Sequence, residues 1–394
     1  MDLTTSRCWV EISLGALVSN CRVLHQLIPP GCRLMNILKA NAYGHGAIPA
    51  ARVLEQVFPD DWIGVACLSE ALELRRAGIR QEILILGYTP PEAAPLLAAE
   101  NITQTLLSPD YTARLAACAA EADATVPCHL KLDTGMTRIG FFAYDDERTL
   151  DELRQVAQLP HLHIEGVFMH FCVADSRAEA DASFTKLQYK RFMDMLSAMA
   201  GVGIRPEIRH CCNSGATILY PEFALDMVRP GIITYGNAPS DELEGALSLR
   251  PMMSLHSMIA QVRTVPAETD ISYGRLYRTK EETRVAVLPI GYADGLSRLL
   301  TGKASFYLQG HQVPVIGRIC MDMCMIDVSG VPEAKPGDVV TIFGYDDDGT
   351  LLPCERLARA QGTINYELLC QISKRIPRIC HRGAETSQIL QYIV

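Results

Sequence analysis

The sequence predicts an α/β protein, a (β/α)8 TIM barrel followed by a C-terminal mostly β domain. Over the first 245 residues, apolar runs of strand length alternate with helical patterns, and eight such strands can be counted. Beyond that point, short apolar runs separated by turns replace the helices. We therefore expect residues 1–245 to form the barrel and residues 246–394 to form the β domain, with an N-terminal strand near residues 8–12 able to pair with the latter.

The barrel elements are expected in a regular order. Residues 9–12 form a short strand, and Ser13 caps a helix over residues 14–27. The eight barrel strands are predicted at residues 33–38, 62–67, 82–87, 102–106, 127–133, 163–170, 206–211 and 226–229. Helices between them are predicted at residues 69–77, 109–122, 147–159 and 183–199. An open doubly wound sheet has the same alternation, but no strand here is accompanied by a glycine-rich nucleotide motif, which favours the barrel.

The second domain has the pattern of an antiparallel β structure. Its apolar runs are separated by turns such as residues 308–311 and 335–338. Strands are predicted at residues 257–265, 284–290, 305–308, 313–316, 325–328 and 339–343, with one helical piece near residues 363–374.

Composition excludes several classes of protein. The 394 residues are 48% hydrophobic and 21% charged, as in an ordinary globular protein, and the net charge of −9 argues against nucleic-acid binding. Neither a signal peptide nor a membrane span is visible, so we expect a cytoplasmic protein. The 14 cysteines are scattered through strand and helix patterns, which indicates buried thiols. Because no paired C-x2-C spacing accompanies them, no metal site is expected.

The first barrel strand ends in a lysine. Lys39 follows an apolar run and precedes Tyr43 and a Gly-His-Gly turn, after which a helical pattern begins at Ile48. A lysine at a strand end can simply face solvent. However, an amine walled in by apolar residues at the mouth of a barrel is desolvated, which makes it nucleophilic.

Other polar residues occupy the ends of later strands. The catalytic groups of a barrel lie at the carboxyl ends of its strands, so their convergence predicts a site. Taken singly, His170 could be a core histidine, Asn213 and Ser214 a helix cap, and Arg229 half of an ion pair. Backbone N–H groups near Ser214, Gly231 and Ile232 would also suit an anion such as phosphate. The residues at these strand ends run from Lys131 to Arg138, at His170, from Asn213 to Gly215 and from Arg229 to Ile232.

These segments resemble, in order and across nearly the whole chain, the motifs of alanine racemases, enzymes that use pyridoxal 5′-phosphate (PLP). The resemblance implies that Lys39 forms the Schiff base with the cofactor and that Tyr43 helps to hold its phosphate. It places His170 against the pyridine ring and Arg229 opposite the ring nitrogen. The remaining cofactor contacts that it implies are Asn213, Ser214, Gly231, Ile232 and, from the β domain, Tyr366.

The resemblance also implies substrate contacts and a modified lysine. Arg138 would contact the phenolic oxygen of the cofactor and the substrate carboxylate, and the backbone N–H of Met321 would reach the same carboxylate. Lys131 corresponds to a lysine that carries a carbamate in many members, an anion able to orient Arg138. Residues 291–295, Gly-Tyr-Ala-Asp-Gly, form a further family string without an assigned role.

Racemisation requires one base on each face of the α-carbon. The resemblance assigns Lys39 to the proton of the D-isomer and Tyr273 to that of the L-isomer. Because a tyrosine is a poor base at neutral pH, cationic neighbours are needed, and His170 and Arg229 are the expected ones. Arginine does not readily give up a proton, so the ring nitrogen should stay neutral, which favours reprotonation over transamination. Tyr273 would come from the neighbouring subunit of a head-to-tail homodimer.

The expected activity is interconversion of L- and D-alanine, supplying D-alanine for cell-wall peptidoglycan. A serine or broad-specificity racemase of the same family is the nearest alternative, although Tyr366 favours the small alanine side chain. A PLP-dependent decarboxylase with the same two-domain architecture would show a different pattern around the ring. A non-catalytic PLP-binding protein would generally lack the domain that carries Tyr273, Met321 and Tyr366.

Overall fold

The computed structural model describes residues 6–144, 146–383 and 385–392. Within them the chain divides into two compact units. The barrel unit comprises residues 18–42 and 50–250, and the β unit comprises residues 1–17, 43–49 and 251–394. The β unit therefore includes the N-terminal segment and a short piece that begins four residues after Lys39.

The barrel unit is a closed barrel of eight parallel strands, as predicted. The order is β5-β4-β3-β2-β10-β9-β8-β6, and pairing of β5 with β6 closes the ring, with β7 (Phe141–Phe142) added beside β6. These strands are β2 (Arg33–Ile37), β3 (Trp62–Val65), β4 (Ile83–Ile85), β5 (Ile102–Leu106), β6 (Val126–Asp133), β8 (Leu162–Phe168), β9 (Ile208–His210) and β10 (Met227–Val228). Most of their residues are buried, because helices cover a parallel sheet on its outer face.

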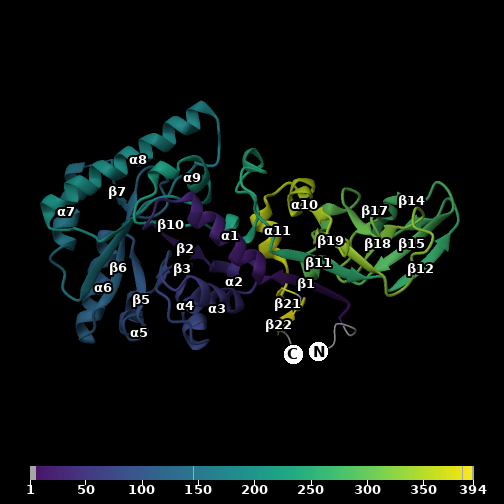
Figure 1. The fold of residues 1–394 in the computed structure, drawn as a ribbon, viewed down its shortest axis with the longest axis horizontal. Helices are drawn as coiled ribbons and strands as arrows, with labels where there is room; N and C mark the ends of the chain where they lie inside the picture. The colour runs from purple at the N-terminus through teal and green to yellow at the C-terminus, as the bar shows by residue number, and fades with distance from the viewer. Residues whose placement is uncertain (1–5, 145, 384, 393–394) are drawn as a thin grey trace. The chain divides into compact units, whose positions relative to one another are not determined.

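Helices connect these strands and flank them (Figure 1). Ser13 caps the first helix, as predicted, since its hydroxyl accepts a hydrogen bond from the Ala16 N–H at 3.2 Å. Ser108 does the same for α6, with Tyr111 as donor. The right-handed α-helices are α1 (Leu14–Leu27), α3 (Ala47–Val57), α4 (Leu68–Arg76), α5 (Ala94–Ala99), α6 (Pro109–Glu121), α7 (Asp146–Val156), α8 (Glu179–Met199) and α9 (Ser214–Leu219), whereas α2 (Lys39–Tyr43) contains a left-handed turn.

The β unit is built on a second sheet, with order β12-β15-β18-β17-β16-β19-β11-β1-β21-β22 and β20 beside β19. Strand β1 (Cys8–Ser13) pairs with both β11 and β21. The other strands are β11 (Met253–Met258), β12 (Gln261–Val265), β15 (Thr283–Leu288), β16 (Ser305–Leu308), β17 (His311–Ile316), β18 (Cys324–Asp327), β19 (Val339–Tyr345), β20 (Leu351–Leu352), β21 (Arg378–Arg382) and β22 (Glu385–Leu390). A separate hairpin is formed by β13 (Asp270–Ile271) and β14 (Tyr277–Arg278).

One expectation for this unit was wrong, and one was incomplete. The predicted strand at residues 257–265 is two strands, because Ile259 and Ala260 interrupt the run and donate to different partners, Asp338 and Val287. The helical piece predicted at residues 363–374 is α11 (Asn365–Gln371), and α10 (Cys354–Gln361) precedes it. The sequence pattern missed α10 because two turns contain few apolar residues, even though Leu357 and Ala358 are buried.

Candidate active site

The mouth of the barrel collects the polar residues that the sequence places at strand ends. Because the strands are parallel, the segments that follow β2, β6, β8, β9 and β10 all lie at the same end of the barrel. Nine of the predicted site residues belong to this unit, and the other four belong to the β unit. The barrel group is Lys39, Lys131, Arg138, His170, Asn213, Ser214, Arg229, Gly231 and Ile232.

Lys39 opens a turn of left-handed helix, which the sequence did not predict. Residues 40–43 all have φ between 52° and 55°, a conformation that costs L-residues roughly 1–2 kcal/mol each. The carboxylate of Glu70 stabilises the start of this turn, since its two oxygens accept from the backbone N–H groups of Ala40 and Ala66, each at 2.7 Å. Glu70 therefore ties the segment behind Lys39 to the end of strand β3.

Glu70→Gln should loosen this turn. An amide keeps one acceptor oxygen but turns the other contact into a donor facing a donor, so we expect a loss of about 1–2 kcal/mol in the free energy of unfolding. Hydrogen–deuterium exchange should rise over residues 38–44. The control is Glu73→Gln, on the exposed face of the same helix. Equal exchange in the two variants would contradict the role assigned to Glu70.

Arg229 is the buried cation of the barrel mouth. Its Nη2 donates to the carbonyl oxygens of Met169 (2.6 Å) and Cys211 (3.0 Å) and lies 3.4 Å from His170 Nδ1. A guanidinium only donates, so His170 must accept through Nδ1 and is therefore neutral. Burial lowers the pKa of His170 well below its ordinary value, and Arg229 adds to that shift. The expectation of a cationic His170 is thus wrong, and Arg229 is the cation, although burial lowers its pKa to about 10.

Lys131 lies inside the barrel, on strand β6. Its ammonium nitrogen donates to the Leu132 carbonyl at 2.8 Å and lies 5.4 Å from the centre of the Phe168 ring. Burial, reinforced by Arg229, lowers the pKa of Lys131 to about 7. A substantial share of this amine is therefore uncharged at neutral pH.

Arg138 lies in the loop between β6 and β7 and is exposed. Asp133, the last residue of the strand, shapes this loop by accepting from the N–H groups of Gly135 (2.9 Å) and Thr137 (3.1 Å). A Cβ at residue 140 would lie 2.7 Å from the Lys131 carbonyl oxygen, so a glycine is needed where the loop returns to the strand.

The loops after β9 and β10 contact each other directly. Ser214 Oγ accepts from the Gly231 N–H at 2.9 Å. Asn213 caps helix α9 through its Oδ1, which accepts from the Ala216 N–H at 3.0 Å, so the helix-cap interpretation is confirmed. A hydroxyl and adjacent backbone N–H groups are thus brought together, a donor set that suits a phosphate.

In the β unit, Tyr43 and Tyr366 lie together, with ring centres 5.9 Å apart. Tyr43 is buried, which raises the pKa of its phenol. The chain after it presses against α11, since a Cβ at residue 44 would lie 2.5 Å from the Leu369 carbonyl oxygen. Arg378, fully buried, donates to the Gly44 carbonyl at 3.2 Å and also to three carbonyls after α11, which joins the two segments.

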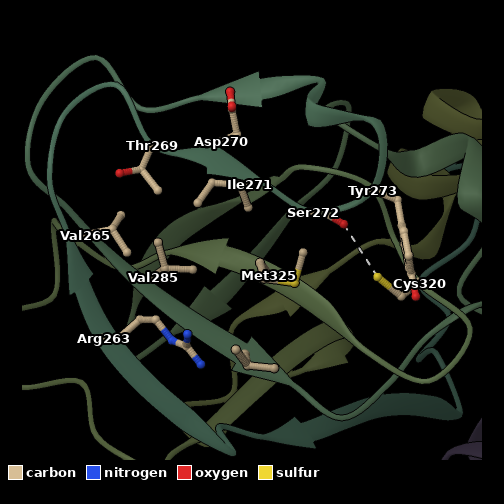
Figure 2. A pocket seen from close by; sticks show the side chains of 11 residues that line it. Arg263, Val265, Thr269, Asp270, Ile271, Ser272, Tyr273, Val285, Cys320 and Met325 are labelled. Atoms are coloured by element: carbon tan, nitrogen blue, oxygen red, sulfur yellow. Dashed lines mark hydrogen bonds between the residues drawn. The ribbon is translucent and has the colours of Figure 1, made fainter.

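Tyr273 stands on an exposed turn of the β13–β14 hairpin, with 71% of its surface accessible. The preceding Ser272 has φ of 66°, and its hydroxyl donates to the Arg318 carbonyl at 2.7 Å. Figure 2 shows the side chain of Tyr273 at the edge of a pocket of about 500 Å³, close to Cys320. Ser272 Oγ lies 3.5 Å from the sulfur of that cysteine. The hairpin turn is thereby fixed to the loop that carries Met321.

The loop of Met321 is clamped by the family string at residues 291–295. Tyr292 and Ala293 donate their N–H groups to the carbonyls of Cys320 and Met321, both at 3.0 Å. Gly291 is needed for this close approach, because a Cβ there would lie 2.3 Å from the Cys320 oxygen. The structure thus gives this string a role that the sequence left open.

Sequence reasoning missed the residues that support the site. Gln188, buried on α8, donates to Thr134 Oγ1 (3.2 Å) and to the His170 carbonyl (3.3 Å), and accepts from the Cys172 N–H (3.0 Å). It thereby joins the loops after β6 and β8. A glutamine in a helical pattern looks like a surface residue, so no signal in one sequence would have found it.

Comparison with known proteins decides the family. The protein-family model described as "Alanine racemase, N-terminal domain" matches residues 12–239. The family model described as "Alanine racemase, C-terminal domain" matches residues 252–380. The chain belongs to the alanine racemase family. It is therefore an enzyme, an isomerase of the alanine racemase class.

Individual alanine racemases match over nearly their full lengths. The protein from Desulfovibrio desulfuricans is 46% identical over 94% of this chain and 97% of its own. The protein from Desulforamulus reducens is 44% identical over 94% of this chain and 98% of its own length. The solved alanine racemase of Clostridium difficile 630 superimposes with a TM-score of 0.92 at 36% identity, covering 99% of this chain and 100% of its own. Within the described residues, no helix combines the length and apolarity that crossing a membrane requires.

Proposed function

We propose that this protein interconverts L- and D-alanine with PLP as cofactor. The observation that carries the proposal is the arrangement at the barrel mouth, where Lys39 follows strand β2 and Arg229 lies buried as a donor-only cation beside His170. An amine that can bond an aldehyde and a donor that can face an unprotonated ring nitrogen are what PLP racemisation requires. The full-length similarity to alanine racemases supports the same conclusion.

The donor set fits this cofactor. The chemistry PLP supplies when bound is an electron sink for the charge left when the α-proton departs. Lys39 would hold its aldehyde carbon, Arg229 its ring nitrogen and His170 its ring face. The phosphate would be held by Ser214, Gly231 and Ile232, with Asn213 supporting their loop and Tyr43 and Tyr366 closing the shell. Contact between Ser214 and Gly231 already places these donors side by side.

The protein's own residues would then move the protons and orient the substrate. Lys39 would carry the proton of the D-isomer, and Tyr273 that of the L-isomer on the opposite face. Arg138 and the Met321 N–H would hold the substrate carboxylate. Arg229, which retains its protons at neutral pH, would leave the ring nitrogen unprotonated. The support for these roles is the position of each residue in its own unit.

We propose that the active enzyme is a head-to-tail homodimer. Tyr273 and Leu276 are 71% and 60% exposed on one turn that a hydrogen bond from Ser272 fixes in place, and apolar side chains exposed side by side are typical of a surface that contacts another protein. Supplied by the neighbouring subunit, this tyrosine would complete the two-base site. A single subunit would then lack one base.

We also propose that Lys131 is carbamylated. An uncharged amine attacks carbon dioxide and loses one proton, which gives an N-carboxylate anion. The lowered pKa of Lys131, about 7, supplies that amine at neutral pH. The charges of Arg229 and Arg138 both lower the pKa of Lys131, and the same charges would favour the carbamate anion. The anion would in turn orient Arg138.

The carbamate should depend on pH in a defined direction. Below pH about 7 the ammonium form of Lys131 dominates and cannot react, so carbamylation should fall as pH drops from 8 to 6. With 13C-bicarbonate, NMR of the protein at pH 8 should show a carbamate signal that Lys131→Gln lacks. A signal of equal intensity in that variant would place the modification elsewhere.

The decisive test of the function is chiral analysis. Purified protein supplied with PLP and L-alanine should yield D-alanine until the two isomers are equal, with a cofactor absorbance band that disappears in Lys39→Ala. Faster racemisation of serine would favour the alternative specificity, and carbon dioxide release from a basic amino acid would favour a decarboxylase. We propose that the D-alanine serves cell-wall peptidoglycan.

A further inference from the structure

One face of helix α8 packs against the loop that follows β6. Phe184, Gln188 and Arg191 are spaced four and three residues apart, so their side chains share one side of the helix. Gln188 Nε2 donates to Thr134 Oγ1 at 3.2 Å, and Arg191 Nη1 donates to the Thr134 carbonyl at 2.9 Å. A Cβ at residue 135 would lie 3.0 Å from the Phe184 ring, so a glycine lets the loop come this close. None of these three α8 residues belongs to the motifs that the family resemblance covers.

Gln188 also holds the segment that follows β8. The ladder between β8 and β9 ends where Phe168 lies opposite His210, so the backbone beyond it needs other partners. Gln188 is fully buried, its Nε2 donates to the His170 carbonyl at 3.3 Å, and its Oε1 accepts from the Cys172 N–H at 3.0 Å. One contact needs a donor and the other an acceptor. An amide offers both, whereas an ionised carboxylate or an ammonium offers only one.

Other side chains hold the residues beside these two contacts. Arg229 donates to the Met169 carbonyl at 2.6 Å, one residue before His170. Asn213 Nδ2 donates to the Phe171 carbonyl at 3.4 Å. The two backbone groups that flank Phe171 are therefore the ones that depend on Gln188.

The turn after β6 transmits the position of Thr134 to Arg138. Asp133 Oδ1 accepts from the N–H groups of both Gly135 and Thr137, which closes residues 133–137 into one turn. Arg138 directly follows this turn. A displacement of Thr134 therefore moves the backbone from which the Arg138 side chain extends.

We propose that Gln188 is a positioning residue that fixes the loop of Arg138 and the segment of His170 in one register. A single buried amide bonds to both, so neither can shift without breaking a contact with α8. The consequence for catalysis rests on the proposed function, in which Arg138 holds the substrate carboxylate and His170 lies on the ring face. Loss of Gln188 should then misplace the substrate relative to the ring, which weakens binding and slows turnover together.

Hydrogen–deuterium exchange of the PLP-loaded protein tests the contacts without turnover. Gln188→Met keeps the length of the side chain and removes all three hydrogen bonds. Exchange should therefore rise by about fivefold to tenfold over residues 134–138 and also over residues 170–173. Thr134→Val removes only the hydroxyl contact, so exchange should rise over residues 134–138 alone.

Gln81→Met is the matched control. Gln81 is another buried glutamine of the barrel, and its Nε2 donates to the carbonyls of Phe58 (2.8 Å) and Asp61 (3.0 Å). These residues precede β3 and β4, so they lie at the end of the barrel opposite the candidate site. A general loss of stability from removing a buried glutamine should appear in this variant too, whereas exchange over the two site segments should not change.

Kinetics provide the second readout. We expect Gln188→Met to lower kcat/KM for alanine by about tenfold to a hundredfold, through a higher KM and a lower kcat. Thr134→Val, which spares the His170 segment, should raise KM by about threefold with kcat within about twofold. Gln81→Met should keep both wild-type values.

The proposal is overturned if Gln188→Met matches Gln81→Met in kcat/KM or in exchange over either segment. Should Gln188→Met fail to fold, Thr134→Val decides, and unchanged exchange over residues 134–138 with unchanged KM would overturn the proposal. If the wild type does not racemise alanine, the proposed function fails, and the exchange data alone confirm or overturn the positioning of the two segments.

Discussion

Tyr273→Phe should reduce racemisation of alanine by about 10²-fold to 10⁴-fold, the contribution of a positioned general acid–base group. Phenylalanine keeps the ring on the exposed turn and removes only the hydroxyl. Since Lys39 remains, the α-proton of D-alanine should still exchange with solvent deuterium, whereas exchange of L-alanine should nearly stop. Mass spectrometry of each isomer after incubation in D2O separates the two half-reactions.

Tyr277→Phe provides the matched control for this experiment. Tyr277 belongs to the same hairpin, but its ring packs partly buried against Ile271, Val285 and Ile316. Its hydroxyl should therefore be dispensable for both exchange reactions. Equal loss of exchange for both alanine isomers in Tyr273→Phe would contradict the assignment of one base to each face, because it would indicate general damage to the site.

Mixing two inactive variants should restore activity. Lys39→Ala lacks one base and Tyr273→Phe lacks the other, so each homodimer should be nearly inactive. If each site takes Lys39 from one subunit and Tyr273 from its partner, a heterodimer has one intact site. Random exchange of subunits makes half the dimers mixed, and recovery should approach roughly a quarter of wild-type activity.

The control for the mixing experiment carries both substitutions in one chain. Mixed with Tyr273→Phe, that double variant can form no intact site and should stay inactive. Recovery in this control would point to contamination. Absence of recovery in the main mixture, with heterodimers demonstrated by native mass spectrometry, would show that each subunit uses its own tyrosine.

The barrel could be predicted from the sequence because its signal is local and periodic. Strand β5 was predicted to the residue, and the lysine and arginine of the mouth were found because parallel strands bring their ends together. The family resemblance supplied the rest of the predicted set. Assignment of each residue to its role in catalysis stays a prediction, as does the bracketing of one carbon by residues 39 and 273.

What the sequence could not show depends on contacts between distant segments. The left-handed turn at residues 40–43 contains no glycine and only Asn41 favours that conformation, so the sequence pattern does not reveal it, and Glu70 supports it from 30 positions away. The charge of His170 was mispredicted because protonation depends on what each ring nitrogen faces, here the donor Arg229. The bulge in β8, where Cys128 lies opposite Ile164 but His129 lies opposite Gly166, likewise appears only when β6 and β8 are paired.

The pairing of β1 has a consequence for synthesis on the ribosome. Val10 lies opposite Leu255 in β11 and opposite Arg378 in β21. The first strand to leave the exit tunnel therefore cannot complete its pairing until almost the whole chain has been synthesised. During translation the intervening barrel can complete its own sheet while this N-terminal edge stays unsatisfied. Pairing between segments so distant in sequence slows folding. Until it is complete, the unpaired edge of β1 can associate with other nascent chains, so we expect chaperones to assist this step.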